Sequence, residues 1–139
     1  MAEVGAVVVA YDMVSPYGWG VAPCWEGLFS GRTAIRRFDR FSTASLRTDK
    51  AAFVPGLDPN ADETLVMQMV RPLLEKGVSG IPADALLLLA TTNGEIDLLE
   101  RSVLHGTADA SDSCPDLLAG KIQNLCGLDE PGVVICAAC

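Results

Sequence analysis

At 139 residues, half of them apolar, the chain is long enough to form one packed domain of ordinary size. Its net charge of −8 argues against a general nucleic-acid-binding protein. No apolar run approaches the roughly 20 residues that a membrane-spanning helix needs, and the N-terminus, with Glu3 and no basic stretch, does not resemble a secretory signal. We therefore expect a soluble, cytoplasmic protein.

The first half of the chain is predicted to hold few regular elements. Val7, Val8 and Val9 follow one another without a polar break, which is typical of a strand covered on both faces. The predicted elements are, in order, a buried strand at 6–10, a turn at Ser15-Pro16, a helix at 21–30 that ends at Gly31, and a loop at 31–59 with one extended piece at 51–54.

The second half reads as alternating helices and strands, because apolar residues recur at helical spacing between continuous apolar runs. The predicted elements are a helix from 65 to Gly77, a buried strand at 85–90, a helix starting at Ile96, a polar loop at 106–113, a helix from Pro115 to Gly127, and a buried strand at 133–136. Residues 58–62 include candidate N-cap residues for the first of these helices, and Glu63 is expected in its first turn, where acidic side chains are favoured. Pro72 is expected to kink this helix or to shift its start.

This order of elements predicts an α/β architecture. Strands without polar breaks indicate a mostly parallel sheet that is buried between layers of helices, with right-handed crossovers.

The five cysteines are odd in number and irregularly spaced, which does not suggest a disulfide framework. We expect reduced thiols, most of them small apolar core residues. They are Cys24, Cys114, Cys126, Cys136 and Cys139.

The sequence "PGVVICAAC" admits three interpretations. Cys136 and Cys139 could form a redox pair, but Cys136 then lies within an apolar run, where a buried thiol is inert. They could ligate zinc with two of Cys114, Cys126 and His105, although none of these forms a second ligand pair. Cys139 could instead be a nucleophile delivered at the carboxyl end of a buried parallel strand, where α/β proteins gather their ligands.

Six of the ten basic residues lie in one short stretch, with only Asp39 and Asp49 opposing them. They are Arg32, Arg36, Arg37, Arg40, Arg47 and Lys50. Such a stretch is either a solvated loop face or a surface for an acidic partner or a phosphate.

Several segments resemble β-ketoacyl synthases, in the same order and spacing. "VVVAYDMVSPYGWG" resembles that family's opening strand and turn, "WEGLFSGRTAIRRFDRF" its following helix and Gly-Arg stretch, and "PGVVICAAC" the strand that leads to its active-site cysteine. The matching positions are Trp25, Leu28, Gly31, Arg32, Ile35, Ala119, Gly120, Gly127, Leu128, Pro131, Ala138 and Cys139.

The resemblance implies that residues 1–139 are the N-terminal part of a synthase domain of thiolase-like α/β/α layering, with the remainder of the domain absent from this chain. It implies an acyl-accepting nucleophile at Cys139, whose backbone N–H contributes to an oxyanion hole, and no cofactor or metal. The family's two catalytic histidines and lysine follow the nucleophile, so His105 is not among them, and the piece alone is expected to be inactive.

The implied reaction is the decarboxylative condensation of an acyl thioester with a malonyl thioester, in fatty acid, polyketide or polyene biosynthesis. The implied partners are an acyl carrier protein with phosphopantetheine-linked substrate, and a second synthase-like subunit in a homodimer or heterodimer. Arg32, Arg36, Arg37 and Arg40 are candidates for docking the acidic carrier.

The sequence departs from the family at Tyr11-Asp12-Met13, at Asp116 and in a short loop at 105–115, which favours a specialised synthase. Two alternatives remain open. A thiolase shares the fold and the strand-end cysteine but uses coenzyme A substrates without decarboxylation, and a non-catalytic, chain-length-factor type of subunit would only assemble with an active partner.

Overall fold

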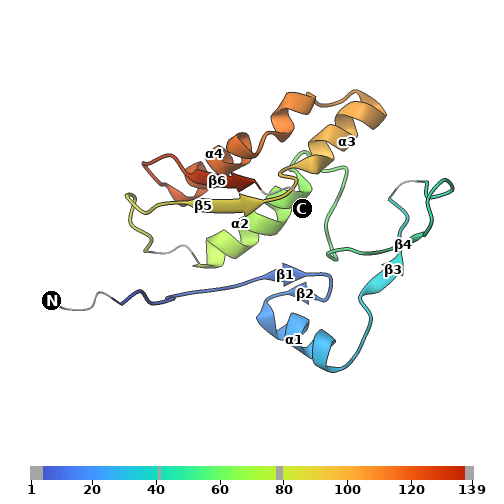
Figure 1. Cartoon of the computed structure of the whole chain (residues 1–139), viewed down its shortest axis with the longest axis horizontal. Helices are drawn as coiled ribbons and strands as arrows, with labels where there is room; N and C mark the ends of the chain where they lie inside the picture. The colour runs from blue at the N-terminus through green and yellow to red at the C-terminus, as the bar shows by residue number, and fades with distance from the viewer. Residues whose placement is uncertain (1–4, 41, 78–79, 137–139) are drawn as a thin grey trace. The chain divides into compact units, whose positions relative to one another are not determined.

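The computed structural model describes residues 5–40, 42–77 and 80–136 (Figure 1). The chain divides into two compact units, Met1–Gly56 and Leu57–Cys139, which we call the N-terminal unit and the C-terminal unit.

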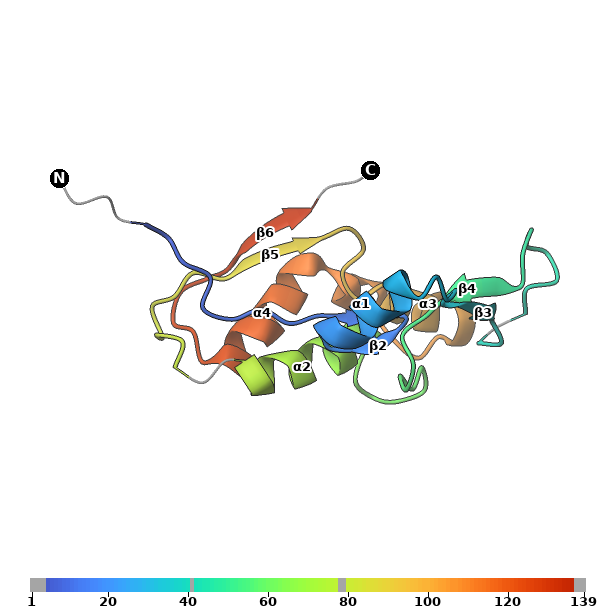
Figure 2. The ribbon, with the colours of Figure 1, turned by 90° about the horizontal axis from the view of Figure 1, so that it is seen from below.

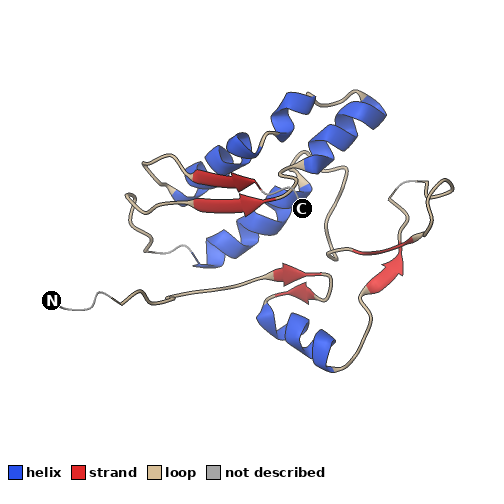
Figure 3. Ribbon diagram, viewed as in Figure 1, coloured by secondary structure: helices blue, strands red, loops and turns tan. Residues whose placement is uncertain are grey.

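The described residues of the N-terminal unit form two small antiparallel hairpins and one helix (Figure 3). Its elements are β1 (Val14–Ser15), paired with β2 (Gly18–Trp19), then α1 (Val21–Phe29), then β3 (Ile35–Arg37), paired with β4 (Lys50–Ala52). Both hairpins fall in segments that were predicted to be turn or loop, apart from the extended piece near β4.

Helix α1 is fixed at both ends by contacts within the N-terminal unit. Gly20, at φ +94°, precedes the helix and donates its N–H to the Met13 carbonyl at 2.8 Å. The chain leaves α1 through Gly31 at φ +65°, the left-handed region that favours glycine, which confirms the predicted helix end. The Tyr17 hydroxyl donates to the Arg32 carbonyl at 2.8 Å and so ties the chain beyond α1 back to the β1–β2 hairpin.

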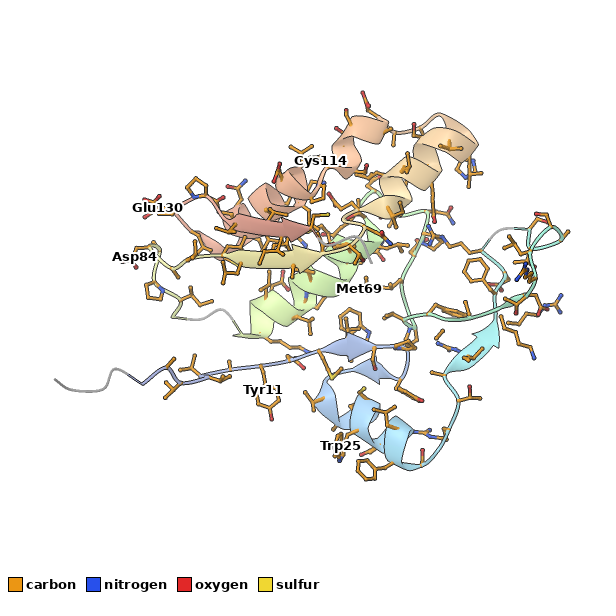
Figure 4. All side chains as sticks on the ribbon, in the orientation of Figure 1. Tyr11, Trp25, Met69, Asp84, Cys114 and Glu130 are labelled. Atoms are coloured by element: carbon orange, nitrogen blue, oxygen red, sulfur yellow. The ribbon has the colours of Figure 1, made fainter. Side chains whose placement is uncertain are left out.

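The prediction of a buried strand at residues 6–10 is wrong. Val7, Val8 and Val9 are 81%, 83% and 92% exposed and belong to no strand. Tyr11 also projects from this segment, as Figure 4 shows. The apolar composition is that of a strand, but no other described segment pairs with these residues.

The C-terminal unit holds a parallel pair of strands and most of the helical structure. Its elements are α2 (Leu65–Gly77), β5 (Leu88–Thr91), α3 (Ile96–His105), the 3₁₀ helix η1 (Ala110–Ser113), α4 (Pro115–Cys126) and β6 (Val133–Cys136). Strands β5 and β6 pair in parallel, with Leu88 opposite Val133 and Thr91 opposite Cys136. Helices α2 and α4 lie on one side of this pair (Figure 2).

The core of this unit lies where α2 and α4 pack beneath the strands. Met67, Leu118 and Ile122 are buried at its centre, and each such side chain contributes about 1.5–3 kcal/mol by leaving water. Leu87 and Leu89 pack against this cluster from the sheet. The helical spacing of apolar residues predicted both helices and part of their packed faces, including Leu118 and Ile122, but not Met67, the residue of α2 that is buried.

The opposite face of the β5–β6 pair is exposed, which corrects the expected fold. Leu88 is 62% and Ile135 is 54% exposed, so these strands are covered on one face only. The chain is a mixed α/β protein, as predicted, but two of its three described strand pairs are antiparallel rather than mostly parallel. A run of apolar residues does not by itself reveal whether the second face has a partner.

Local signals predicted the helix ends with mixed success. Pro115 occupies the first turn of α4, and Gly127 ends it at φ +65°, both as expected. Helix α2 starts at Leu65, as predicted, but its cap is Thr64, whose hydroxyl accepts the Met67 N–H at 3.3 Å, and Glu63 lies before the helix and not in its first turn. The helix continues past Pro72 without a shift of its start.

The predicted polar loop at 106–113 contains the short helix η1. The Asp109 carboxylate accepts the Ser111 N–H at 2.9 Å and the Ser111 hydroxyl at 2.8 Å. These two hydrogen bonds lower the pKa of Asp109, and the one from the Ser111 backbone has the larger effect.

Among the described helices of the chain, none combines the length and the apolar character needed to cross a membrane.

Candidate active site

The candidate site lies at the carboxyl end of the parallel β5–β6 pair. The register places Cys136, the last residue of β6, opposite Thr91, the last residue of β5. The Cys136 thiol donates to the Thr92 carbonyl at an S···O distance of 3.9 Å. Ligand sites of parallel sheets form at this end of the strands.

Cys136 itself is exposed, so the interpretation of a buried, inert thiol at this position is wrong. Cys136 is exposed because, in the part of this unit that the structure describes, α2 and α4 lie on one side of the β5–β6 pair and no helix covers the other side. Cys139, the predicted nucleophile, lies outside the described residues, three positions after the end of β6.

The turn that follows β5 has a fixed geometry beside Cys136. The Gly94 N–H donates to the Thr91 hydroxyl at 2.9 Å. Gly94 lies at φ +54°, and a Cβ at this position would lie 3.1 Å from the Ser113 carbonyl oxygen. Glycine is therefore required both by the backbone conformation and by the close approach of the chain before α4.

Beneath this turn lies a buried carboxylate, Glu95, which is fully inaccessible. Its Oε1 accepts the Thr64 hydroxyl at 2.5 Å and its Oε2 accepts Lys121 Nζ at 2.6 Å. Glu95 thus joins the start of α3 to the start of α2 and to the middle of α4. Glu95 is the buried member of this pair, whereas the Lys121 side chain is 43% exposed. Removing Lys121 would leave the buried carboxylate uncompensated, which makes the contact a constraint on geometry.

A second buried carboxylate, Asp97, lies two residues further on and is 2% exposed. Its Oδ2 accepts the Leu65 N–H at 3.1 Å and Arg101 Nη2 at 3.2 Å. Asp97 Oδ1 and Arg101 Nε are buried without a hydrogen-bond partner. The free N–H at the start of α2 is therefore satisfied by a side chain from α3.

Glu95 and Asp97 affect the candidate site by fixing the position of the turn after β5. Both are shielded from solvent and accept hydrogen bonds from internal donors, Glu95 through both oxygens and Asp97 through Oδ2, so they help to hold the turn after β5 in place. Neither residue was predicted from the sequence. The available signal was "NGEID", two acidic residues at the start of a helix directly after a strand, together with Lys121 as the lone cation in "PDLLAGKIQNLC".

The cysteines differ from the expectation of mostly apolar core residues. Cys114 and Cys136 are exposed, whereas Cys24 and Cys126 are half-buried. Burial raises the pKa of the Cys126 thiol.

The proposed zinc ligands do not gather into a site in the described part of the chain. His105 is exposed at the end of α3. Among the described residues, no three His, Cys, Asp or Glu side chains are placed to hold a metal ion.

The basic stretch lies on the exposed surface of the N-terminal unit, and several of its arginines have partners within this unit. Arg32 Nε donates to the Ser30 hydroxyl at 3.0 Å. Arg36 Nη2 donates to the Phe53 carbonyl at 2.8 Å. These two arginines therefore serve the fold of the N-terminal unit, whereas Arg37 forms an exposed pair with Asp49, at 3.6 Å.

Comparison with known proteins adds no relative: neither a scan against protein-family models nor a search of curated proteins finds a match to this chain.

Proposed function

We propose that the chain is the N-terminal part of a β-ketoacyl synthase, with thiolase-like α/β/α layering in the complete domain and Cys139 as the acyl-accepting nucleophile. The observation that carries the proposal is the motif "PGVVICAAC", whose residues Val133–Cys136 form strand β6 and end beside the end of a parallel strand. A cysteine that follows such a strand end is placed where α/β enzymes bind their substrates.

The surroundings of the strand end support this assignment. The turn after β5 is fixed by Gly94 and by the buried Glu95, so the edge beside the Cys136 end of β6 is held by specific contacts. Rigid supporting contacts of this kind hold a reacting group in a productive orientation.

The proposed reaction has two steps. The Cys139 thiolate attacks the carbonyl carbon of an acyl thioester, a new C–S bond forms, the C–S bond to the carrier breaks, and the carrier thiolate leaves and takes up a proton from solvent. A malonyl thioester then loses CO₂, and the resulting carbanion attacks the acyl-cysteine carbonyl. A C–C bond forms, the Cys139 thiolate is released, and the product is a 3-oxoacyl thioester. Covalent catalysis divides one difficult condensation into these two easier steps.

The test is acyl loading of the complete enzyme in which these residues occur, measured by intact mass after incubation with an acyl thioester. We expect one acyl adduct on the unmodified enzyme and none on the Cys139→Ala variant. Cys136→Ala is the matched control, since it removes an exposed thiol from the same strand end, and it should retain the adduct. Loading that persists in Cys139→Ala would overturn the assignment.

The same preparation separates the alternatives. Release of CO₂ from a malonyl thioester with formation of a 3-oxoacyl product identifies a synthase. Acyl exchange with coenzyme A without decarboxylation identifies a thiolase. Absence of any adduct on the complete protein identifies a non-catalytic subunit.

A further inference from the structure

The β3–β4 hairpin of the N-terminal unit concentrates positive charge on an acidic chain. Residues 32–50 contain six basic and two acidic residues, whereas residues 57–139 contain four basic and thirteen acidic residues. Figure 4 shows side-chain nitrogens projecting around this hairpin. Arg37 and Lys50 are both exposed there.

The register of the hairpin places Arg37 directly opposite Lys50. Like charges at directly opposed positions destabilise an antiparallel pair. Asp49 offsets little of this, because its pair with Arg37 spans 3.6 Å with the two side chains 49% and 83% exposed. The hairpin therefore keeps a charge arrangement that its own stability does not favour.

The two faces of the hairpin have different roles. Arg36 Nη2 donates to the Phe53 carbonyl at 2.8 Å, and its guanidinium carbon lies 4.4 Å from the centre of the Phe53 ring. Arg36 therefore clamps β3 onto the segment after β4. Since successive residues of a strand point to opposite faces, Arg37 projects from the other face.

That second face combines two cations with an apolar side chain. Ile35 shares it with Arg37, and their cross-strand partners Ala52 and Lys50 complete it. Ile35 is 57% exposed. We name the set Ile35, Arg37, Lys50 and Ala52 the docking face.

We propose that the docking face binds an acidic surface of a folded partner protein. An apolar side chain beside two cations matches a protein surface that combines carboxylates with an apolar contact. A nucleic acid backbone offers no such apolar contact, and the acidic remainder of this chain repels a long polyanion. An acidic partner can engage two cations locally, because salt screens longer-range repulsion beyond roughly 8–10 Å.

The inference rests on the proposed function only for the choice of probe, an acyl carrier protein in its apo form. The apo form has no phosphopantetheine arm, so its binding reports surface contact and does not require a working active site. Acyl loading and carrier binding can therefore fail independently of one another.

The experiment measures the Kd of the full protein for the apo carrier at low and at high salt, with Lys50→Glu as the main variant. This change replaces the unfavourable Arg37–Lys50 pair with an opposite-charge pair, so the hairpin is not weakened. We expect binding of the unmodified protein to weaken with salt. Lys50→Glu should bind on the order of tenfold more weakly. Lys76→Glu, the same charge change at the exposed end of α2, should leave the Kd unchanged.

Three outcomes would overturn the proposal. The first is equal carrier affinity for the Lys50→Glu and Lys76→Glu variants. The second is tighter, Lys50-dependent binding of a mixed-sequence oligonucleotide, which would make nucleic acid the partner. The third is a salt-sensitive dimer that sediments without carrier and is lost in Lys50→Glu, which would make a second copy of this chain the occupant.

Discussion

The two units of the molecule differ in what lies at their centres. In the C-terminal unit, Met67, Leu118 and Ile122 form a buried apolar cluster, and two buried carboxylates tie three helices together. In the described part of the N-terminal unit, no large apolar side chain is buried, and Trp25 and Phe29 are 61% and 73% exposed.

The difference teaches that periodicity alone does not make a core. Both units contain apolar residues at strand or helix spacing, but among the described residues only the packing of helices against strands in the C-terminal unit buries large apolar side chains. The N-terminal unit is held by short hairpins, a cation–π contact and the Tyr17 hydrogen bond. Such local contacts give low resistance to opening. We therefore expect the two units to respond separately to substitution.

The largest expected effect comes from Leu118→Ala in the centre of the C-terminal unit. Leu118 is 1% exposed, and its truncation should lower the free energy of unfolding by about 3–5 kcal/mol through lost burial and the remaining cavity. The measurement is a denaturant titration followed by far-UV circular dichroism, which reports mainly the helices of this unit.

The neighbouring residue supplies the matched control. Leu117 is 48% exposed, so Leu117→Ala should cost less than about 1 kcal/mol. The chain's two tryptophans, Trp19 and Trp25, both lie in the N-terminal unit. Their fluorescence transition should stay in place in Leu118→Ala, and a coincident shift of both transitions would show that the units unfold as one.

Local chemistry made the helix ends predictable from the sequence. Pro115, Gly31 and Gly127 act through their own backbone conformations, so no knowledge of the tertiary structure was needed. Burial of Val7 to Val9 required a pairing partner and was predicted wrongly for that reason. The cap of α2 was misplaced because several residues before Thr64 offer equally good capping chemistry.

The candidate site was harder to predict from the sequence than the helix ends. The strand-end position of Cys136 followed from the apolar run and the parallel arrangement, but its exposure depends on what packs beside the strand end. Glu95 lies 31 residues from Thr64 and 26 from Lys121 in the sequence. Only the packing of α2 and α4 under the sheet brings these three side chains together.

A smaller effect, confined to the other unit, is expected from Gly27→Ala. A Cβ at Gly27 would overlap the ring of Tyr17, and such overpacking typically costs about 1–3 kcal/mol. Tryptophan fluorescence should show the N-terminal unit unfolding at lower denaturant.

Gly120→Ala provides the comparison, since Gly120 lies within α4 and a Cβ there meets nothing within 4 Å. Alanine should stabilise that helix by about 0.5–1 kcal/mol. If Gly27→Ala were also stabilising, Tyr17 would not pack against α1 as described.

The smallest effect is on thiol reactivity, and it distinguishes the interior of the C-terminal unit from its surface. Burial raises the pKa of Cys126, which packs against the core, whereas Cys114 is exposed in the same unit. Because the thiolate is the reactive form, iodoacetamide should alkylate Cys126 more slowly than Cys114 at neutral pH. Peptide mass spectrometry measures both rates, and the two should become similar in denaturant.

The raised pKa of Cys126 also fixes the sign of a pH dependence. The folded state favours the neutral thiol, so this contribution to stability is present below the ordinary thiol pKa of about 8.5. It is lost as the pH rises from that value through the higher pKa of the folded state. Cys126→Ser, which cannot ionise in this range, should show a smaller loss of stability above neutral pH. An unchanged pH dependence in Cys126→Ser would mean that the thiol is not held in the core, and the contrast between the two units would then rest on the apolar cluster alone.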